Sequence, residues 1–135
     1  MAGFVGRAAR RRVAAADTSS LQRFLRDDRG SDVDTIAELA RTDDLLLPPV
    51  VLTEALSDHM LPLSLVVRIQ SFPLLEFHDG YWERAGTLRA TLRRDGLKAK
   101  LADCLIAQSC IDHDIPLITY DRDFRHFVRA GLQLA

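Results

Sequence analysis

Short apolar runs alternate along the chain with longer segments in which apolar residues recur at helical spacing. Such runs are typical of parallel strands that are covered on both faces. We expect strands at residues 13–16, 45–47, 74–77 and 116–119, and an edge strand at 132–134. The alternation of strands with helices predicts a three-layer α/β/α sandwich with a mostly parallel central sheet. Right-handed crossovers would bring the C-terminal ends of the strands to one edge of that sheet.

Glycine and proline residues delimit the helices between these strands. Gly30, Gly96 and Gly131 end helices, whereas Pro49 suits the first turn of one. The segment 79–95 is the clearest amphipathic helix. Its apolar stripe consists of Tyr81, Ala85, Leu88 and Leu92. The other helices are expected near residues 19–29, 31–40, 50–58, 62–71, 101–113 and 123–128.

Composition narrows the class of protein. With 135 residues, 47% hydrophobic and 27% charged, the chain should form one domain with a real core. A net charge of −1 predicts no strong general attraction to nucleic acid or membranes, so a nucleic-acid site would need a local basic patch. No apolar run approaches the roughly 20 residues of a membrane span. Cys104 and Cys110 fall on different sides of one predicted helix, which favours reduced thiols in a cytoplasmic protein.

Residues 1–12 are interpreted as an extension that precedes a single domain at 13–135. Their basic residues are Arg7, Arg10, Arg11 and Arg12. The extension lacks the apolar segment of a secretory signal. A solvated tail and a phosphate-contacting arm are both consistent with this composition.

Asp103 stands out because its predicted surroundings are apolar. Ile106 and Ala107 lie at helical spacing from it, with Cys110 one turn further on, so its carboxylate should be at least half buried. Buried carboxylates almost always have a partner. Apart from Lys100, no basic residue shares that face of the helix. We therefore expect a cation from elsewhere beside Asp103.

Three further acids could meet Asp103 in the fold. Asp17 follows the first strand, Asp121 follows the strand at 116–119, and Glu54 lies on an apolar helix face. In a parallel sheet, Asp17 and Asp121 would share the edge at which ligands usually bind. Two carboxylates about 4 Å apart repel each other by roughly 4 kcal/mol at an effective dielectric near 20. Mg²⁺ or Mn²⁺ would relieve this repulsion, because hard cations take carboxylate and water ligands.

Each acid also has a separate structural interpretation. Asp17 and Asp121 could cap the helices that follow them, and Glu54 could be a surface acid. Joint placement of all four favours a metal site over these separate roles. Zn²⁺ is less expected, since no His or Cys has ligand spacing with these acids. A Mg²⁺ site of this kind binds phosphates and lowers the pKa of bound water so that hydroxide can attack phosphorus, which is nuclease chemistry.

The same segments resemble the motifs of a known family. VAAADTSS is similar to the opening strand-Asp-Thr-Ser of PIN-domain nucleases, and VVLTEAL to their Pro-x-x-x-x-Glu helix. LADCLIAQSC resembles their x-x-Asp-x-x-Ile-Ala helix, and LITYDRDF resembles their closing Thr-x-Asp-x-Asp-Phe. The resemblance runs from Val13 to about Phe124 and keeps the order and rough spacing of all four acids. The chain departs from the pattern in its Arg-rich extension and in Gln108, where small residues are common. In size it matches the VapC-type toxins of toxin–antitoxin pairs.

This resemblance implies a Mg²⁺- or Mn²⁺-dependent endoribonuclease, often homodimeric, that a small antitoxin protein inhibits by occluding the acidic pocket. By match, the catalytic acids are Asp17, Glu54, Asp103 and Asp121. The expected metal ligands are Asp17, Asp103 and Asp121, with Glu54 and Asp123 as further candidates. Ser19 and Thr119 would orient carboxylates or water. The substrate would be a tRNA, rRNA or mRNA. Candidate RNA contacts are Arg10, Arg11, Arg12, Lys98 and Lys100.

Three other functions are alternatives to this interpretation. Phosphatases of the haloacid-dehalogenase type also have an Asp after a first strand, but they need a second acid two residues later, where this chain has Ser19. A second alternative, an RNA-processing PIN nuclease that is not a toxin, stays open. So does a non-catalytic PIN-like module that binds RNA or protein, although such a module would be expected to have lost one or more acids. Between Asp121 and Asp123, we expect Asp121 to be the ligand because it lies nearer the strand end.

Overall fold

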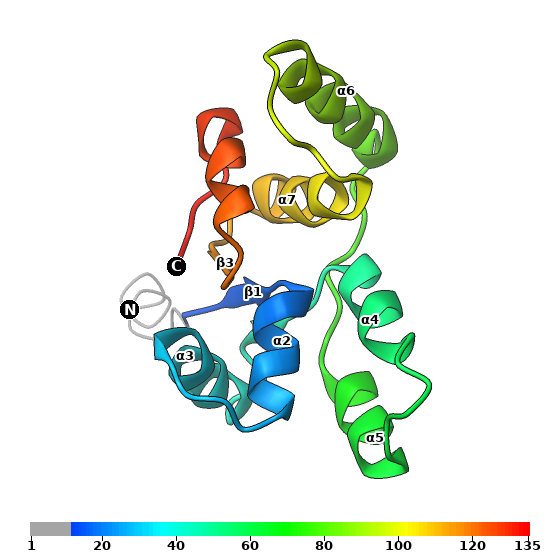
Figure 1. Cartoon of the computed structure of the whole chain (residues 1–135), viewed down its shortest axis with the longest axis vertical. Helices are drawn as coiled ribbons and strands as arrows, with labels where there is room; N and C mark the ends of the chain where they lie inside the picture. The colour runs from blue at the N-terminus through cyan, green and yellow to red at the C-terminus, as the bar shows by residue number, and fades with distance from the viewer. Residues whose placement is uncertain (1–11) are drawn as a thin grey trace, which may run out of the picture.

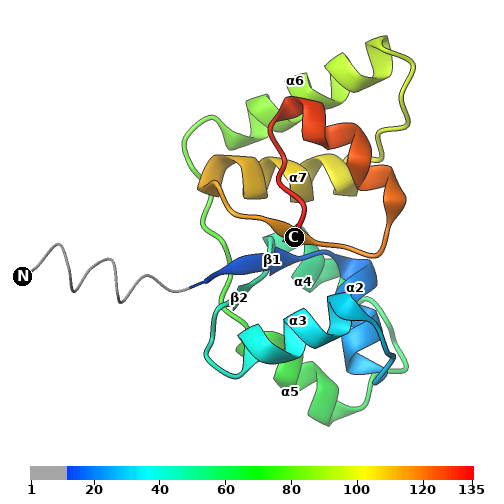
Figure 2. The same ribbon diagram turned by 90° about the vertical axis from the view of Figure 1, so that its left-hand side faces the viewer.

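A small parallel sheet lies between two layers of helices in the computed structural model, which describes residues 12–135 (Figures 1 and 2). Within those residues, the strands β1 (Ala14–Ala16), β2 (Leu45–Leu46) and β3 (Leu117–Ile118) pair in the order β2-β1-β3. All pairings are parallel, with Ala14 beside Leu45 and Ala15 beside Leu117. The C-terminal ends of the strands therefore share one edge, as the alternating pattern predicts.

Two expected strands are reduced to single bridges. Leu74 pairs in parallel with Leu47, and Leu134 pairs in parallel with Leu117. Beyond Leu74 the segment leaves the sheet, and Phe77 is exposed. These bridges extend the sheet by one position on each side without adding a full strand.

The helices form the two outer layers (Figure 1). One layer contains α6 (Tyr81–Arg94), α7 (Leu101–His113) and the 3₁₀ segment η1 (Arg122–Ala130). The other contains α2 (Thr18–Leu25), α3 (Ser31–Ala40), α4 (Pro49–Leu56) and α5 (Leu63–Ser71). The bounds of α7 match those expected from its apolar pattern. None of these described helices is both long enough and apolar enough to span a bilayer.

The core is built around the alanines of β1, which are almost completely buried. Their small side chains allow helices to approach the central strand from both faces. Large buried side chains fill the space on the two sides, and they include Leu21, Ile36, Ile106, Phe124 and Phe127. The predicted stripe of α6 is buried as expected, whereas the neighbouring Trp82 is 59% exposed. Cys104 and Cys110 are buried free thiols, and burial raises their pKa values to about 11 and about 12.

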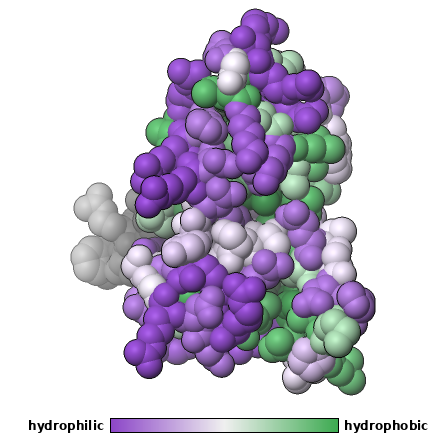
Figure 3. All heavy atoms as spheres, viewed as in Figure 1, coloured by the Kyte–Doolittle hydropathy of each residue, from purple (hydrophilic) through white to green (hydrophobic). Residues whose placement is uncertain are grey.

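Apolar side chains stay exposed at the end of the molecule formed by α5 (Figure 3). Met60, which precedes α5, and Leu63 and Val67 on α5 are each more than half exposed, although Ile69 on α5 is completely buried. α5 packs against α4 and thus uses only one face for the core. An exposed apolar group of this kind is a common feature of surfaces that contact another protein.

Candidate active site

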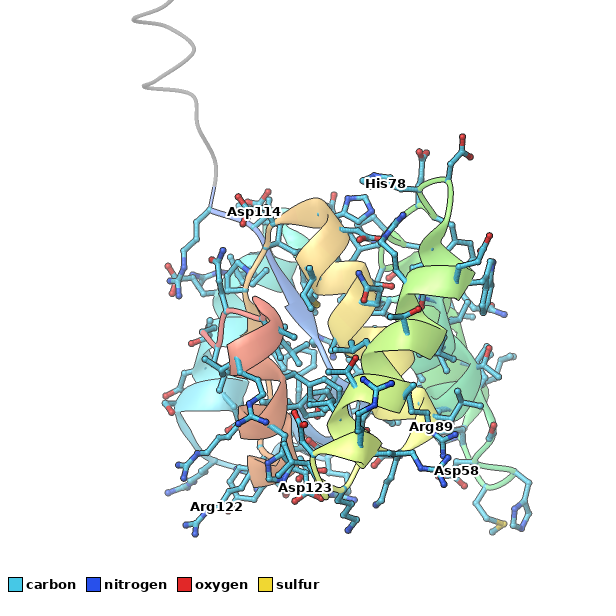
Figure 4. The ribbon with its side chains drawn as sticks, turned by 90° about the horizontal axis from the view of Figure 1, so that it is seen from above. Asp58, His78, Arg89, Asp114, Arg122 and Asp123 are labelled. Carbon is cyan, nitrogen blue, oxygen red and sulfur yellow. The ribbon has the colours of Figure 1, made fainter. Side chains whose placement is uncertain are left out.

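The parallel strands bring acids from distant parts of the chain to one edge of the sheet. Asp17 follows β1 directly, and Asp121 follows β3 after two residues. The backbone N–H of Asp17 donates to the carbonyl of Ile118, which fixes the ends of the two strands side by side. Asp123 and Arg122 lie at this end of the molecule, and Asp114 lies at the opposite end (Figure 4).

Asp17 is the most constrained of the acids. It is 2% exposed and caps α2 by accepting a hydrogen bond from the Ser20 N–H at 2.9 Å. The Ser19 hydroxyl donates to both carboxylate oxygens at 2.8–2.9 Å, and the Thr119 hydroxyl donates to Oδ2 at 2.6 Å. Burial raises the pKa of Asp17, and these three donors lower it without cancelling the effect. The cap interpretation and the site interpretation of Asp17 are therefore compatible.

Ser19 and Thr119 both hydrogen-bond a carboxylate, as the motif resemblance implies. Thr119 has a second contact, because its Oγ1 accepts the Asp121 N–H at 3.0 Å. It therefore links β3 to Asp17 and to the turn that carries Asp121. The Ser19 hydroxyl likewise accepts the Tyr120 N–H at 3.4 Å. Two hydroxyl groups thus connect the ends of β1 and β3.

Asp103 lies in the first turn of α7 and is partly buried. Its pKa is raised to about 6, mainly by burial and then by the negative charge of Asp121. Asp17 and Glu54 raise this pKa further, whereas Lys100 lowers it. All four predicted acids are therefore close enough to interact electrostatically. Lys100, at the N-cap position, makes no side-chain capping bond that would fix the helix start.

Glu54 reaches the site from α4 and is held by a residue that sequence reasoning missed. The Thr18 hydroxyl donates to Glu54 Oε1 at 2.6 Å. Thr18 begins α2, directly after Asp17, so one turn of chain positions two of the acids. The Asp-Thr-Ser motif contained the signal, since each of its three polar residues faces a site acid or is one.

The geometry separates Asp121 from Asp123. Asp121 caps η1 by accepting the Asp123 N–H at 2.9 Å, and its charge raises the pKa values of both Asp17 and Asp103. The Asp123 carboxylate instead forms an ion pair with Lys98 at 3.4 Å. Asp121 is thus the acid that interacts with Asp17 and Asp103, whereas Asp123 is paired with Lys98.

Of the candidate RNA-contacting residues, the structure describes Arg12, Lys98 and Lys100. Arg10 and Arg11 lie outside the described residues. Arg12 is exposed at the N-terminal end of β1, five residues before Asp17, which corresponds to about 16 Å of extended chain. Lys98 and Lys100 both lie just before the start of α7, and Lys98 forms an ion pair with Asp123.

The donor atoms at this edge suit a hard divalent cation. They are carboxylate oxygens that repel one another, and Lys100 is the one positive group among those that shift the pKa of Asp103. In residues 12–135, no three His, Cys, Asp or Glu side chains are arranged to hold a metal ion as they stand. At least one of the carboxylates would therefore have to rotate toward an ion. The chemistry of the site fits Mg²⁺ or Mn²⁺, although the side chains do not form a closed ligand set.

Comparison with known proteins places the chain in a family. The model of the PIN domain matches residues 14–130. The fold is similar to that of a chain in the crystal structure of VapBC2 from Rickettsia felis bound to a DNA fragment from their promoter, with a TM-score of 0.71 and 21% sequence identity. That alignment covers 91% of this chain and 97% of the other. No curated protein matches significantly. Because the family match spans most of the sequence and includes all four acids, the chain belongs to the PIN domain family.

Proposed function

We propose that this PIN domain is a Mg²⁺- or Mn²⁺-dependent endoribonuclease that hydrolyses RNA phosphodiesters. The observation that carries the proposal is that acids from separate elements are brought together around the ends of β1 and β3, where Thr18 holds Glu54 and Thr119 links Asp17 to the turn of Asp121. The charges of these three acids all raise the pKa of Asp103. A set of acids held together at a cost in electrostatic repulsion is typical of sites that bind cations. Family membership supports nuclease chemistry for such a site.

Asp17, Asp103 and Asp121 would hold the ion, and Glu54 would bind it directly or through water. When bound, the cation would lower the pKa of a coordinated water and neutralise charge on the phosphodiester. The chain itself supplies orientation: Ser19 and Thr119 keep the Asp17 carboxylate fixed. Burial excludes bulk water from Asp17 and strengthens each interaction it makes.

Glu54 has the freedom that a proton-accepting group requires. It is partly exposed, and Thr18 holds only one of its oxygens, Oε1. The other oxygen is available to orient water or to accept a proton from it. Removal of Thr18 would therefore loosen Glu54 without removing a carboxylate.

A role as the toxin of a toxin–antitoxin pair is the preferred setting for this activity. Its support is the similarity of fold to the VapBC2 chain, together with the size of the domain. In this setting a small antitoxin would cover the acidic edge, and two copies of the chain would form a homodimer. The exposed apolar side chains of α5 are consistent with contact to another protein. An RNA-processing nuclease and a non-catalytic binding module are the alternatives.

Cleavage of single-stranded or loop RNA should require Mg²⁺ or Mn²⁺ and Asp103. Total RNA and a set of tRNAs are incubated with the purified protein with and without Mn²⁺, and products are resolved on gels. We expect cleavage that EDTA abolishes and that Asp103→Asn lowers by at least about 100-fold, as loss of a charge-stabilising group does in other enzymes. Asp114→Asn is the matched control: Asp114 ends the same helix with φ 53°, which Asn tolerates. Cleavage that survives both EDTA and Asp103→Asn would rule out the metal mechanism.

The two acids after β3 should differ sharply in their effect on catalysis. Asp121→Asn should abolish Mn²⁺-dependent cleavage, because the Asp121 carboxylate interacts with Asp17 and Asp103. Asp123→Asn should change the rate by less than about tenfold, because its carboxylate pairs with Lys98. Rates are compared at saturating Mn²⁺ on one RNA. The reverse order of effects would assign the ligand role to Asp123.

Without metal, Asp103→Asn should stabilise the fold at pH 8. The pKa of Asp103 rises from 3.8 to about 6 on folding, so its ionised form destabilises the native state by roughly 1–3 kcal/mol above pH 6. As pH falls from about 6 to 4, the native protein binds the proton first, so the advantage of the variant should shrink. Urea unfolding in EDTA at several pH values measures this difference. A variant that is less stable than wild type at pH 8 would show that the Asp103 charge is already compensated in the fold.

Expression in a bacterial host separates a toxin from a housekeeping nuclease. A toxin should arrest growth soon after induction, and Asp103→Asn should not, since the arrest depends on RNA cleavage. Growth curves with matched protein levels on immunoblots provide the measurement, with Asp114→Asn as control. If wild-type protein cleaves RNA in vitro but leaves growth unchanged, the toxin role fails while the nuclease role stands.

A further inference from the structure

Tyr120 is an exposed aromatic residue at the rim of the acid site. It lies between Thr119 and Asp121 and is 63% exposed. Its backbone N–H is held by the Ser19 hydroxyl, so the ring projects from a fixed point of the site. A large aromatic side chain contributes little to a core from this position. Its role must therefore be sought at the surface.

One face of the Tyr120 ring is covered by an arginine that is itself held in place. The guanidinium carbon of Arg23 lies 3.9 Å from the ring centroid, which is cation–π geometry. Arg23 Nε donates to Asp32 at 3.0 Å, and an Nη2 hydrogen bond of 2.6 Å joins it to the Arg29 carbonyl. The Ser20 hydroxyl also donates to Asp32. The Arg23 side chain is only 15% exposed and covers one face of the Tyr120 ring. Because Tyr120 itself is highly exposed, the opposite face of its ring is open to solvent.

A shallow hollow adjoins the acid site at this point. Its lining includes Thr119, Tyr120, Asp121, Arg122, Arg125 and Leu134. Thr119 and Asp121 belong to the acid site as well, so the hollow and the site are continuous. Arg122 and Arg125 are exposed, and neither forms an ion pair with another residue in the 12–135 range.

This combination suits an unpaired nucleotide. Single-stranded RNA is bound by aromatic faces on which bases stack and by basic groups that contact phosphates. We propose that the hollow binds one unpaired nucleotide next to the scissile phosphate, with its base stacked on Tyr120 and its phosphates contacted by Arg122 and Arg125. The inference rests on the proposed ribonuclease function and adds to it how the substrate strand is positioned.

Binding of RNA with and without bases tests this subsite. Fluorescence anisotropy is measured in EDTA with Asp103→Asn protein, so that cleavage does not interfere. One probe is a short single-stranded RNA, and the other is the same strand with abasic nucleotides. Tyr120→Leu removes the aromatic face, whereas Tyr120→Phe retains it. A double variant, Arg122→Gln with Arg125→Gln, tests the phosphate contacts through the dependence of affinity on salt.

We expect Tyr120→Leu to weaken binding of the normal RNA by at least about fivefold, with Tyr120→Phe close to the parent protein. Abasic RNA should bind the parent and Tyr120→Leu equally. The double arginine variant should reduce the salt slope by about 1.4, or about 0.7 for each lost phosphate contact. Equal affinity of the parent for normal and abasic RNA would overturn the stacking role, and this comparison needs no substitution at Tyr120. An unchanged salt slope would overturn the phosphate contacts.

Failure of the subsite can be told from failure of the ribonuclease proposal. If otherwise wild-type protein cleaves RNA with Mn²⁺ and Tyr120→Leu leaves KM unchanged, the subsite is wrong and the activity stands. If no RNA is cleaved but binding still depends on bases and on Tyr120, the activity is wrong and the subsite stands. Melting temperatures of the variants serve as a check, and Tyr120→Leu should unfold at the same temperature as the parent because the ring is exposed.

Discussion

Repulsion among carboxylates that the sheet brings together is the constraint on which the rest of this structure depends. Asp17 is partly compensated, since three hydrogen-bond donors converge on it at the end of β1. Within residues 12–135, no comparable donor reaches the Asp103 carboxylate, and its pKa of about 6 reflects burial and three acidic neighbours. The repulsion is therefore concentrated on the side of the cluster that α7 contributes. A divalent cation between Asp103 and its neighbours would convert this cost into binding energy.

At two positions of the fold, the residue that caps a helical segment is also one of the site acids. Asp17 begins α2 and Asp121 begins η1, so the backbone that starts each element also fixes the carboxylate. A cap aims its carboxylate at backbone N–H groups, which leaves the remaining lone pairs for other partners. The fold thus positions the acids through local structure, and no separate scaffold is needed. Tyr120 is also positioned through its backbone, because its N–H donates to the hydroxyl of Ser19 in the first turn of α2.

The sequence contained enough information for the placement of the acids and for some of their partners, such as Ser19 and Thr119, but not for all of them. Strand-end acids and the bounds of α7 follow from local patterns, which depend on nearby residues only. The Thr18 bond to Glu54 spans 36 positions, and the Arg23 contact with Tyr120 joins segments that lie still further apart along the chain, so neither has a local signal. The strand expected at 74–77 shrinks to one bridge because pairing depends on the neighbouring strand as well as on apolar content. Asp103 lies in the first turn of α7, as the expected helix at 101–113 implies, and at that position the helix dipole favours a carboxylate.

Anomalous diffraction from crystals grown with Mn²⁺ tests the central claim most directly. The account predicts a strong peak at the sheet edge within bonding distance, roughly 2.0–2.3 Å, of oxygens from Asp17, Asp103 and Asp121. The same experiment on Asp103→Asn should show a weaker peak or none. Absence of any peak among the four acids at saturating Mn²⁺ would contradict the account, as would a peak elsewhere that persists in the variant.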